Sequence, residues 1–241
     1  MDRRNFLKVL RILGSRYKRD LPAHIREDPF RTMIGCLLST RTLDERTDIA
    51  YTALFSRYPT LESLLAADPE VVKELVRPVN FYATKAKRVL EAASYISKVH
   101  GGKVPRSRKC LLEVPGIGPK CADIILNYAF RKAAVAVDTH VEVVSKRLGV
   151  CSPEDSYDEA KKKIETLATK RELGRINDIL VCFGKEFCKK RNPKCNICPV
   201  FFYCEWPEKF KAAKREPERY QGTEIRTKRA QDSAKTPDKS L

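Results

Sequence analysis

Four of the nine cysteines lie close together near the C-terminal end of this 241-residue chain. Their spacing is Cys188-x6-Cys195-x2-Cys198-x5-Cys204. Four thiolates at such intervals can enclose a metal centre, and the chemistry suits structural zinc as well as an iron–sulfur cluster. Basic residues lie between the first two cysteines, among them Lys189, Lys190 and Arg191. Because cations bind phosphate, the same loop is suited to contact a nucleic-acid backbone.

The other five cysteines are scattered among apolar residues, where we expect small core side chains: Cys36, Cys110, Cys121, Cys151 and Cys182. An odd total argues against a framework of disulfide bonds and favours a reducing compartment. No apolar run reaches the roughly 20 residues that span a bilayer. The first residues also lack the apolar segment and the cleavage site of a signal peptide. We therefore expect an intracellular protein of the cytoplasm or nucleoid, with no membrane partner.

A second chemical feature is the segment LLEVPGIGPKCADIILNYAF, which covers residues 111–130. Gly116 and Gly118 permit a tight turn between two helices, and Pro119 suits the first position of the second helix. Backbone N–H groups at such a helix start can bind a phosphate without reading the base sequence. The pattern is typical of a helix-hairpin-helix element, although an ordinary turn between two helices is the simpler alternative.

Lys120 falls at the second position of the second helix in this hairpin. A helix N-terminus destabilises a cation by a few tenths of a kcal/mol to about 1 kcal/mol, and partial burial would act in the same direction. Both effects favour the neutral amine that a lysine nucleophile needs. A surface lysine that binds a phosphate is the alternative interpretation.

The segment AVAVDTHVEVV follows the hairpin and contains a second candidate, Asp138. Thr139 and Glu142 have the spacing of a capping box, which predicts a helix start here. Capping explains Asp138 as well, but a carboxylate held by N–H groups also stays ionised. Such a group can stabilise positive charge that develops on a sugar ring. We expect His140 to form structural hydrogen bonds rather than to take part in catalysis.

PGIGPKCA followed by VDTH resembles the helix-hairpin-helix–Gly/Pro–Asp superfamily of DNA glycosylases, and the lysine at position 120 resembles its endonuclease III branch. The pattern continues from about residue 28 to residue 206. The resemblance implies a bifunctional base-excision-repair enzyme, which removes a damaged base, with oxidised pyrimidines expected, and cleaves the abasic site. It implies that Lys120 is the nucleophile and Asp138 its carboxylate partner. Monofunctional members usually lack the lysine.

The resemblance also bears on the cysteines and on the DNA contacts. The six-two-five spacing matches the [4Fe–4S] loop of the endonuclease III branch and so favours a cluster over zinc. Two loops, at residues 39–42 and 79–82, match those that fill the gap left by the extruded base. Arg41 stands where many members have Gln, and Phe81 where they have Leu, yet both side chains can stack on bases. The expected DNA-binding residues are Arg41, Phe81, Gly116, Gly118, His140, Lys189, Lys190 and Arg191.

Helices must position all of these residues, because helical periodicity runs through most of residues 1–206 with no strand–helix alternation. We predict an all-α fold of two helical domains with the active-site cleft between them. Residues 24–132 form a central bundle with the hairpin. Residues 1–23 plus 133–206 form the iron–sulfur domain, and an amphipathic first helix uses Phe6, Val9, Leu10 and Leu13 as its apolar face. Residues 207–241 form a basic, flexible tail.

The formal charge of +17, from 48 Lys and Arg against 31 Asp and Glu, points to a polyanionic partner. Charge, hairpin and basic loop together predict double-stranded DNA with a damaged base or abasic site, bound by a monomer. Three alternatives stay open. One is a glycosylase for mismatches or other lesions on the same fold. Another is a noncatalytic iron–sulfur protein that binds DNA. The third is an electron carrier, which would need neither the hairpin nor the charge.

Overall fold

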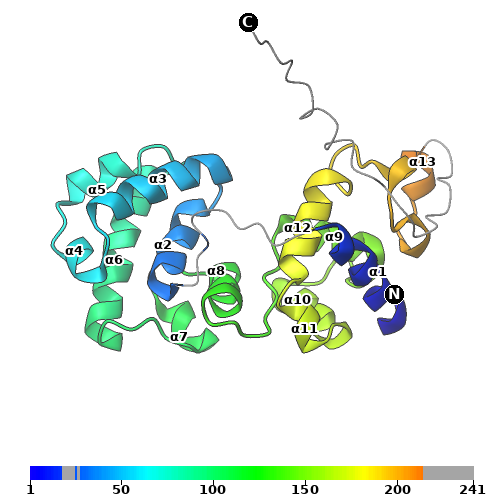
Figure 1. The fold of residues 1–241 in the computed structure, drawn as a ribbon, viewed down its shortest axis with the longest axis horizontal. Coiled ribbons are helices and arrows are strands. Elements are labelled where there is room, and N and C mark those ends of the chain that lie inside the picture. Colours follow the sequence, from blue (N-terminus) through cyan, green and yellow to red (C-terminus); the bar gives the residue numbers. More distant parts are fainter. Residues whose placement is uncertain (18–24, 26–27, 214–241) are drawn as a thin grey trace, which may run out of the picture.

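The computed structural model describes residues 1–17, 25 and 28–213. These residues form helices and contain no strand, which confirms the all-α prediction. Figure 1 shows two groups of helices beside each other, here called the first and the second lobe, with α8 between them. No helix among the described residues is long and apolar enough to cross a bilayer.

The first lobe consists of α2 to α8, each with an apolar face turned to one core. The bounds are α2 (Pro29–Ser39), α3 (Asp44–Arg57), α4 (Leu61–Leu65), α5 (Pro69–Leu75), α6 (Tyr82–His100), α7 (Arg108–Glu113) and α8 (Pro119–Ile124). Buried residues from Ile25 to Ala134 form this core. The longest helix, α6, ends at Gly101, whose φ of 55° is the left-handed conformation that glycine adopts readily at helix ends.

The second lobe joins the start of the chain to its second half. Its helices are α1 (Arg3–Arg16), α9 (Thr139–Leu148), α10 (Tyr157–Leu167), α11 (Lys170–Leu173) and α12 (Ile176–Glu186). All four predicted apolar residues of α1 are buried in its core. Helices α9 and α12 approach closely at Gly184, where an added Cβ would lie 2.9 Å from the Cβ of His140. Glycine is therefore required for this packing.

The chain beyond α12 folds over the second lobe as η2 (Cys195–Ile197), η3 (Phe201–Tyr203) and α13 (Lys209–Ala213). This corrects the prediction of a tail from residue 207. Ala213 is only 2% exposed and packs with Cys195 and Phe201 in a small third core. Burial of that apolar surface holds residues 207–213 on the lobe. The remainder of the predicted tail lies outside the described residues, as does the predicted domain boundary at residues 23–24.

The helix that begins at Pro119 changes its hydrogen-bond pattern after Ile124. Residues Ile125–Ala129 form a π-helix, η1, where the sequence predicted a continuous α-helix. Buried Asn127 lies in this wider turn and donates to the carbonyl of Ala134 at 2.5 Å. It also donates to the carbonyl of Leu173 at 3.0 Å. The altered turn thus satisfies a buried polar group and connects the hairpin helix to the second lobe.

Asp123 provides a stronger connection between the lobes. Its side chain is fully buried and lies 3.3 Å from Nε of Arg108 and 3.2 Å from Nζ of Lys161. The Tyr157 hydroxyl donates to it at 2.9 Å, and burial together with the Asp123 charge raises the pKa of Tyr157. Arg108 belongs to α7, whereas Tyr157 and Lys161 belong to α10. A buried carboxylate requires such partners, so Asp123 fixes α8 against α10.

We predict that Asp123→Asn lowers the free energy of unfolding by about 3 kcal/mol or more, because it removes the buried negative charge that Arg108 and Lys161 both contact. Urea unfolding followed by circular dichroism measures this loss. Asp158→Asn is the matched control, because Asp158 contacts the same Arg108 at 2.6 Å but is 66% exposed. It should cost less than about 1 kcal/mol. Equal losses in the two variants would contradict the interpretation of Asp123 as the connection between lobes.

Candidate active site and metal centre

Lys120 occupies the predicted second position of the hairpin helix. Gly118 is the N-cap of α8 and Pro119 its first residue. The Lys120 side chain is exposed, which corrects the expectation of partial burial. Its charge nevertheless affects the neighbouring thiol of Cys121. The pKa of Cys121 is lowered chiefly by a hydrogen bond with Cys36 and further by the positive charge of Lys120. The amine is thus accessible to a large substrate while its helix is anchored.

Asp138 is itself the N-cap of α9, where the sequence had suggested a capping box beginning at Thr139. Its carboxylate accepts a hydrogen bond from the Val141 N–H at 2.8 Å, which fixes the orientation of the carboxylate at the helix start. The side chain is half-buried, and Glu142 pairs with Lys146 instead of completing a capping box. The helix start therefore orients a partly accessible carboxylate.

A cation lies near Asp138. Lys185 of α12 forms an ion pair with Asp44 at 2.8 Å and so joins the second lobe to the start of α3. Burial lowers the pKa of Lys185, but the hydrogen bond with Asp44 and the charges of Asp44 and Asp138 outweigh it and raise that pKa. Lys185 thus adds positive charge beside the candidate carboxylate.

The two predicted DNA-contacting loops meet at one cavity of about 380 Å³, which Arg41, Phe81 and Gly116 line together. Arg41 and Phe81 both have a left-handed backbone, with φ of 53° and 57°. This conformation is unusual for residues other than glycine. Both side chains are exposed, and Phe81 retains 64% of its accessible surface. An exposed aromatic ring on a strained loop is poorly explained by folding alone.

Hydrogen bonds from the second loop hold the first in place. The Asn80 side chain donates to the Arg41 carbonyl at 2.6 Å, and its backbone N–H donates to Oγ1 of Thr42 at 3.1 Å. Lys85, one turn into α6, donates to the carbonyls of Leu38 and Thr40. The cavity wall is therefore a single bonded unit formed by two segments that lie far apart in the sequence.

The two hairpin glycines have different structural roles. Gly116 has φ of 83°, and an added Cβ would lie 2.7 Å from Cδ2 of Leu37 and 3.1 Å from Cδ of Arg88. Gly118 is extended, with φ of −95°, and no heavy atom lies within 4 Å of the position of its Cβ. The turn thus requires glycine at residue 116, whereas Gly118 leaves open space in front of the α8 N-terminus.

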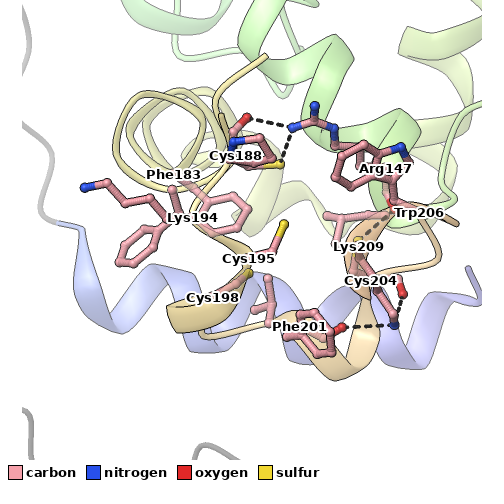
Figure 2. A pocket seen from close by; sticks show the side chains of 14 residues that line it. Arg147, Phe183, Cys188, Lys194, Cys195, Cys198, Phe201, Cys204, Trp206 and Lys209 are labelled. Carbon is pink, nitrogen blue, oxygen red and sulfur yellow. Dashed lines mark hydrogen bonds between the residues drawn. The ribbon is translucent and has the colours of Figure 1, made fainter. Parts of the chain in front are cut away.

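The four clustered cysteines line one pocket (Figure 2). Its other walls are largely apolar and include Phe183, Val200 and Phe201. The guanidinium of Arg147 donates to the carbonyls of Lys189 and Lys190 at 2.8 and 3.1 Å. It also lies 4.2 Å above the ring of Trp206. Arg147 therefore shapes the loop that carries the first cysteine and the exposed cations Lys189, Lys190 and Arg191.

The chemistry of this pocket fits a metal centre with four cysteine ligands. Burial raises the pKa of Cys198 to about 12, and it also raises the pKa values of the other three thiols. Thiolates in such surroundings need a strong positive charge beside them. Among the described residues, no group of three or more His, Cys, Asp or Glu side chains has metal-binding geometry. The donor set and the enclosed pocket fit a thiolate-bound cluster nonetheless.

The remaining candidates are distributed over both lobes. His140 is half-buried and packs against Gly184, in keeping with the structural role expected of it. Lys189, Lys190 and Arg191 are exposed. Of the five cysteines expected in the core, Cys36, Cys121 and Cys151 are buried, but Cys110 and Cys182 are only half-buried.

Three residues of the site were not recognised in the sequence: Lys85, Arg147 and Lys185. Lys85 precedes Val89 by four residues and Ile96 by eleven, so helical spacing places it on the buried face of α6. That signal could have identified it as a lysine with an internal partner. Arg147 and Lys185 carry no such signal, because their partners come from segments distant in the sequence.

Comparison with known proteins places this geometry in a family. Residues 34–170, more than half of the chain, match the profile of the HhH-GPD superfamily of base excision DNA repair proteins. The chain therefore belongs to the helix-hairpin-helix–Gly/Pro–Asp superfamily. Within it, endonuclease III of Thermotoga maritima is 40% identical over 186 residues, which cover 76% of this chain and 85% of the relative.

Solved structures agree with this relationship. A non-covalent endonuclease III–DNA complex has a TM-score of 0.82 at 29% identity and covers 89% of this chain and 100% of that chain. A trapped endonuclease III–DNA covalent intermediate has a TM-score of 0.78 at 30% identity, with coverage of 88% and 98%. The resemblance to the endonuclease III branch is confirmed.

We predict that Gly116→Ala lowers the free energy of unfolding by about 1–3 kcal/mol, through overpacking and backbone strain. Gly118→Ala should leave stability unchanged but weaken DNA binding, because the methyl group obstructs the approach of a phosphate to the α8 N-terminus. Urea unfolding measures the first effect, and fluorescence anisotropy with a labelled abasic-site duplex measures the second. A large stability loss in Gly118→Ala would contradict this division of roles.

Proposed function

We propose that this protein is a base-excision-repair DNA glycosylase and abasic-site lyase. The observation that carries the proposal is an exposed lysine amine at the start of the hairpin helix, in a chain similar to endonuclease III. The trapped covalent intermediate of a solved relative supports a covalent route. The substrate is double-stranded DNA with a damaged pyrimidine or an abasic site.

In the proposed chemistry Lys120 is the nucleophile and Asp138 is the carboxylate that stabilises the charge on the sugar. The lone pair of the neutral Lys120 amine forms a bond to C1′ of the sugar while the glycosidic bond breaks and its electrons leave with the base. The Asp138 carboxylate, oriented by its hydrogen bond with the Val141 N–H, stabilises the positive charge on the ring. The departing base takes up the proton that the new C1′ ammonium gives up. The nitrogen lone pair then breaks the bond between C1′ and the ring oxygen, the oxygen takes up a proton, and a protonated Schiff base remains. Removal of a C2′ proton then expels the 3′ phosphate and cuts the strand.

DNA contacts come from three places in the proposal. N–H groups of α8, next to Gly116 and Gly118, bind the backbone phosphates. Arg41 and Phe81 fill the space left by the extruded base. Lys189, Lys190 and Arg191 bind phosphate farther along the strand, and His140 supports the same surface. The separate hydrophobic cores support two domains, residues 24–132 and residues 1–23 plus 133–206, with the active-site cleft between them.

The metal centre in this proposal is a [4Fe–4S] cluster held by Cys188, Cys195, Cys198 and Cys204. Bound there, the cluster would cross-link the two ends of the loop, and it would take no part in base removal. This fixes the exposed cations near DNA. A glycosylase for mismatched or differently damaged bases is the second candidate function, because Arg41 and Phe81 depart from the residues common in the branch. A panel of thymine glycol, uracil, thymine opposite guanine and pyrimidine-dimer substrates separates the two.

We predict that borohydride traps a covalent adduct between the protein and abasic-site DNA, and that Lys120→Ala abolishes it. Reduction turns the Schiff base into a stable amine, which gel electrophoresis detects as a shifted band. Lys87→Ala, at an exposed lysine of α6, is the matched control and should trap normally. Undiminished trapping in Lys120→Ala would overturn the assignment of the nucleophile.

Asp138→Asn provides a companion test. The amide oxygen can still accept the Val141 N–H, so the α9 cap and the fold should persist. The negative charge is lost, however, and we expect base excision to fall by about 100-fold or more. Single-turnover excision and thermal unfolding measured together distinguish the two roles. Reduced stability with unchanged excision would show that Asp138 is only a cap.

We predict that the purified protein contains iron and inorganic sulfide in equal amounts, with broad visible absorption near 400 nm, as expected for iron–sulfur charge transfer. Cys198→Ser should lose most of this absorption, whereas Cys151→Ser, outside the pocket, should retain it. Elemental analysis that finds one zinc per chain and no sulfide would establish the alternative metal.

A further inference from the structure

Lys85 is a buried lysine that neither the proposed chemistry nor the DNA contacts use. Only 6% of its surface is accessible. Its amine donates to the carbonyls of Leu38 and Thr40, each at 2.7 Å, and to Oγ1 of Thr42 at 2.8 Å. An ammonium group has three N–H donors, so every one of them is used. All three acceptors belong to the end of α2 and the loop that follows it.

The place of Lys85 at the end of α2 explains how its buried positive charge is tolerated. Helix α2 ends at Ser39 and has no basic residue in its last turn. Its last carbonyls need partners from outside the helix. Lys85 supplies the missing cation from α6, where it faces the negative end of the α2 dipole. Burial still disfavours the charge, and it lowers the pKa of Lys85 to about 8. A methionine would fill the same space without this cost, so the amine must act through its hydrogen bonds.

Those hydrogen bonds flank Arg41 directly and connect to the loop of Phe81 through Thr42. Thr40 and Thr42, which flank Arg41, are each bound to the Lys85 amine. Oγ1 of Thr42 also accepts from the N–H of Asn80, the residue before Phe81, at 3.1 Å. Arg41 and Phe81 hold left-handed conformations, which persist only where the surroundings impose them. From α6, the Lys85 amine provides three hydrogen bonds to the end of α2 and the Arg41 loop.

We propose that Lys85 is a positioning residue, a buried clamp that holds Arg41 and Phe81 in their outward conformations before DNA arrives. This inference rests on the proposed function, since it assumes that the two side chains fill the gap beside an extruded base. Without the clamp, both loops relax toward ordinary backbone conformations. The two loops must then become ordered while the base is extruded, and this slows the extrusion. Reaction on DNA that needs no extrusion is unaffected.

The test compares two substrates for Lys85→Met. One is a duplex with a single thymine glycol, and the other is a single strand with one abasic site. We expect single-turnover excision from the duplex to fall by about tenfold, the kinetic equivalent of the strain that the clamp offsets. Borohydride trapping on the single strand should proceed at the wild-type rate. Lys87→Met is the matched control, because it removes an exposed cation, 79% accessible, from the same helix.

A double-mutant cycle makes the test specific. In a Phe81→Ala background the clamp has lost one of the side chains that it positions, so Lys85→Met should slow the duplex reaction less than it does alone. Thr42→Val removes one acceptor and should show a smaller loss with the same duplex selectivity. Thr42→Val also tests the inference if Lys85→Met does not fold.

Each result is decisive. Equal losses on both substrates, no loss on the duplex, or full additivity with Phe81→Ala would overturn the inference. Absence of trapping by the wild-type protein would overturn the proposed function instead, so the two failures are distinguishable.

Discussion

The buried carboxylate of Asp123 is the interaction on which the arrangement of the two lobes depends. It lies three residues after Lys120 and one turn along the same helix, and its partners come from α7 on one side and α10 on the other. Because a buried charge tolerates little displacement from its partners, the hairpin helix cannot move relative to the second lobe without a large cost. The start of α8 and the start of α9, which carry Lys120 and Asp138, are thereby fixed in the same frame.

At the cavity below the hairpin, hydrogen bonds also hold a strained backbone in place. Left-handed backbone at Arg41 and Phe81 projects both side chains outward, and hydrogen bonds from Asn80 and Lys85 hold the peptides that flank them. Gly116 packs against Leu37 and Arg88 at the edge of the same cavity. The phosphate-binding turn and the two loops are therefore supported by one set of contacts, although they come from three segments of the chain.

Residues whose roles depend on their own helix were predictable from the sequence. Lys120 at the second position of α8 follows from Pro119 and the glycines before it, and a carboxylate at the start of α9 follows from the pattern around Asp138. Roles that depend on distant segments were not predictable. The internal acceptors of Lys85, the contacts of Arg147 with the cysteine loop and the packing of α13 on Cys195 all require the folded chain. The expected partial burial of Lys120 was wrong for the same reason, because solvent exposure is set by neighbours outside the helix.

Helix α1 has a consequence for the order of folding during synthesis. It is made before the other helices of the second lobe, yet among the described residues its apolar face packs in the core that residues from 135 onward form. The first lobe, contiguous from α2 to α8, can close while the ribosome is still producing the second, since domains fold as units during translation. Until then, four large apolar side chains of α1 stay uncovered. Folding of the second lobe is therefore the late and aggregation-prone step in biogenesis. The loop of four cysteines follows α9 and α12, the two helices that line its pocket.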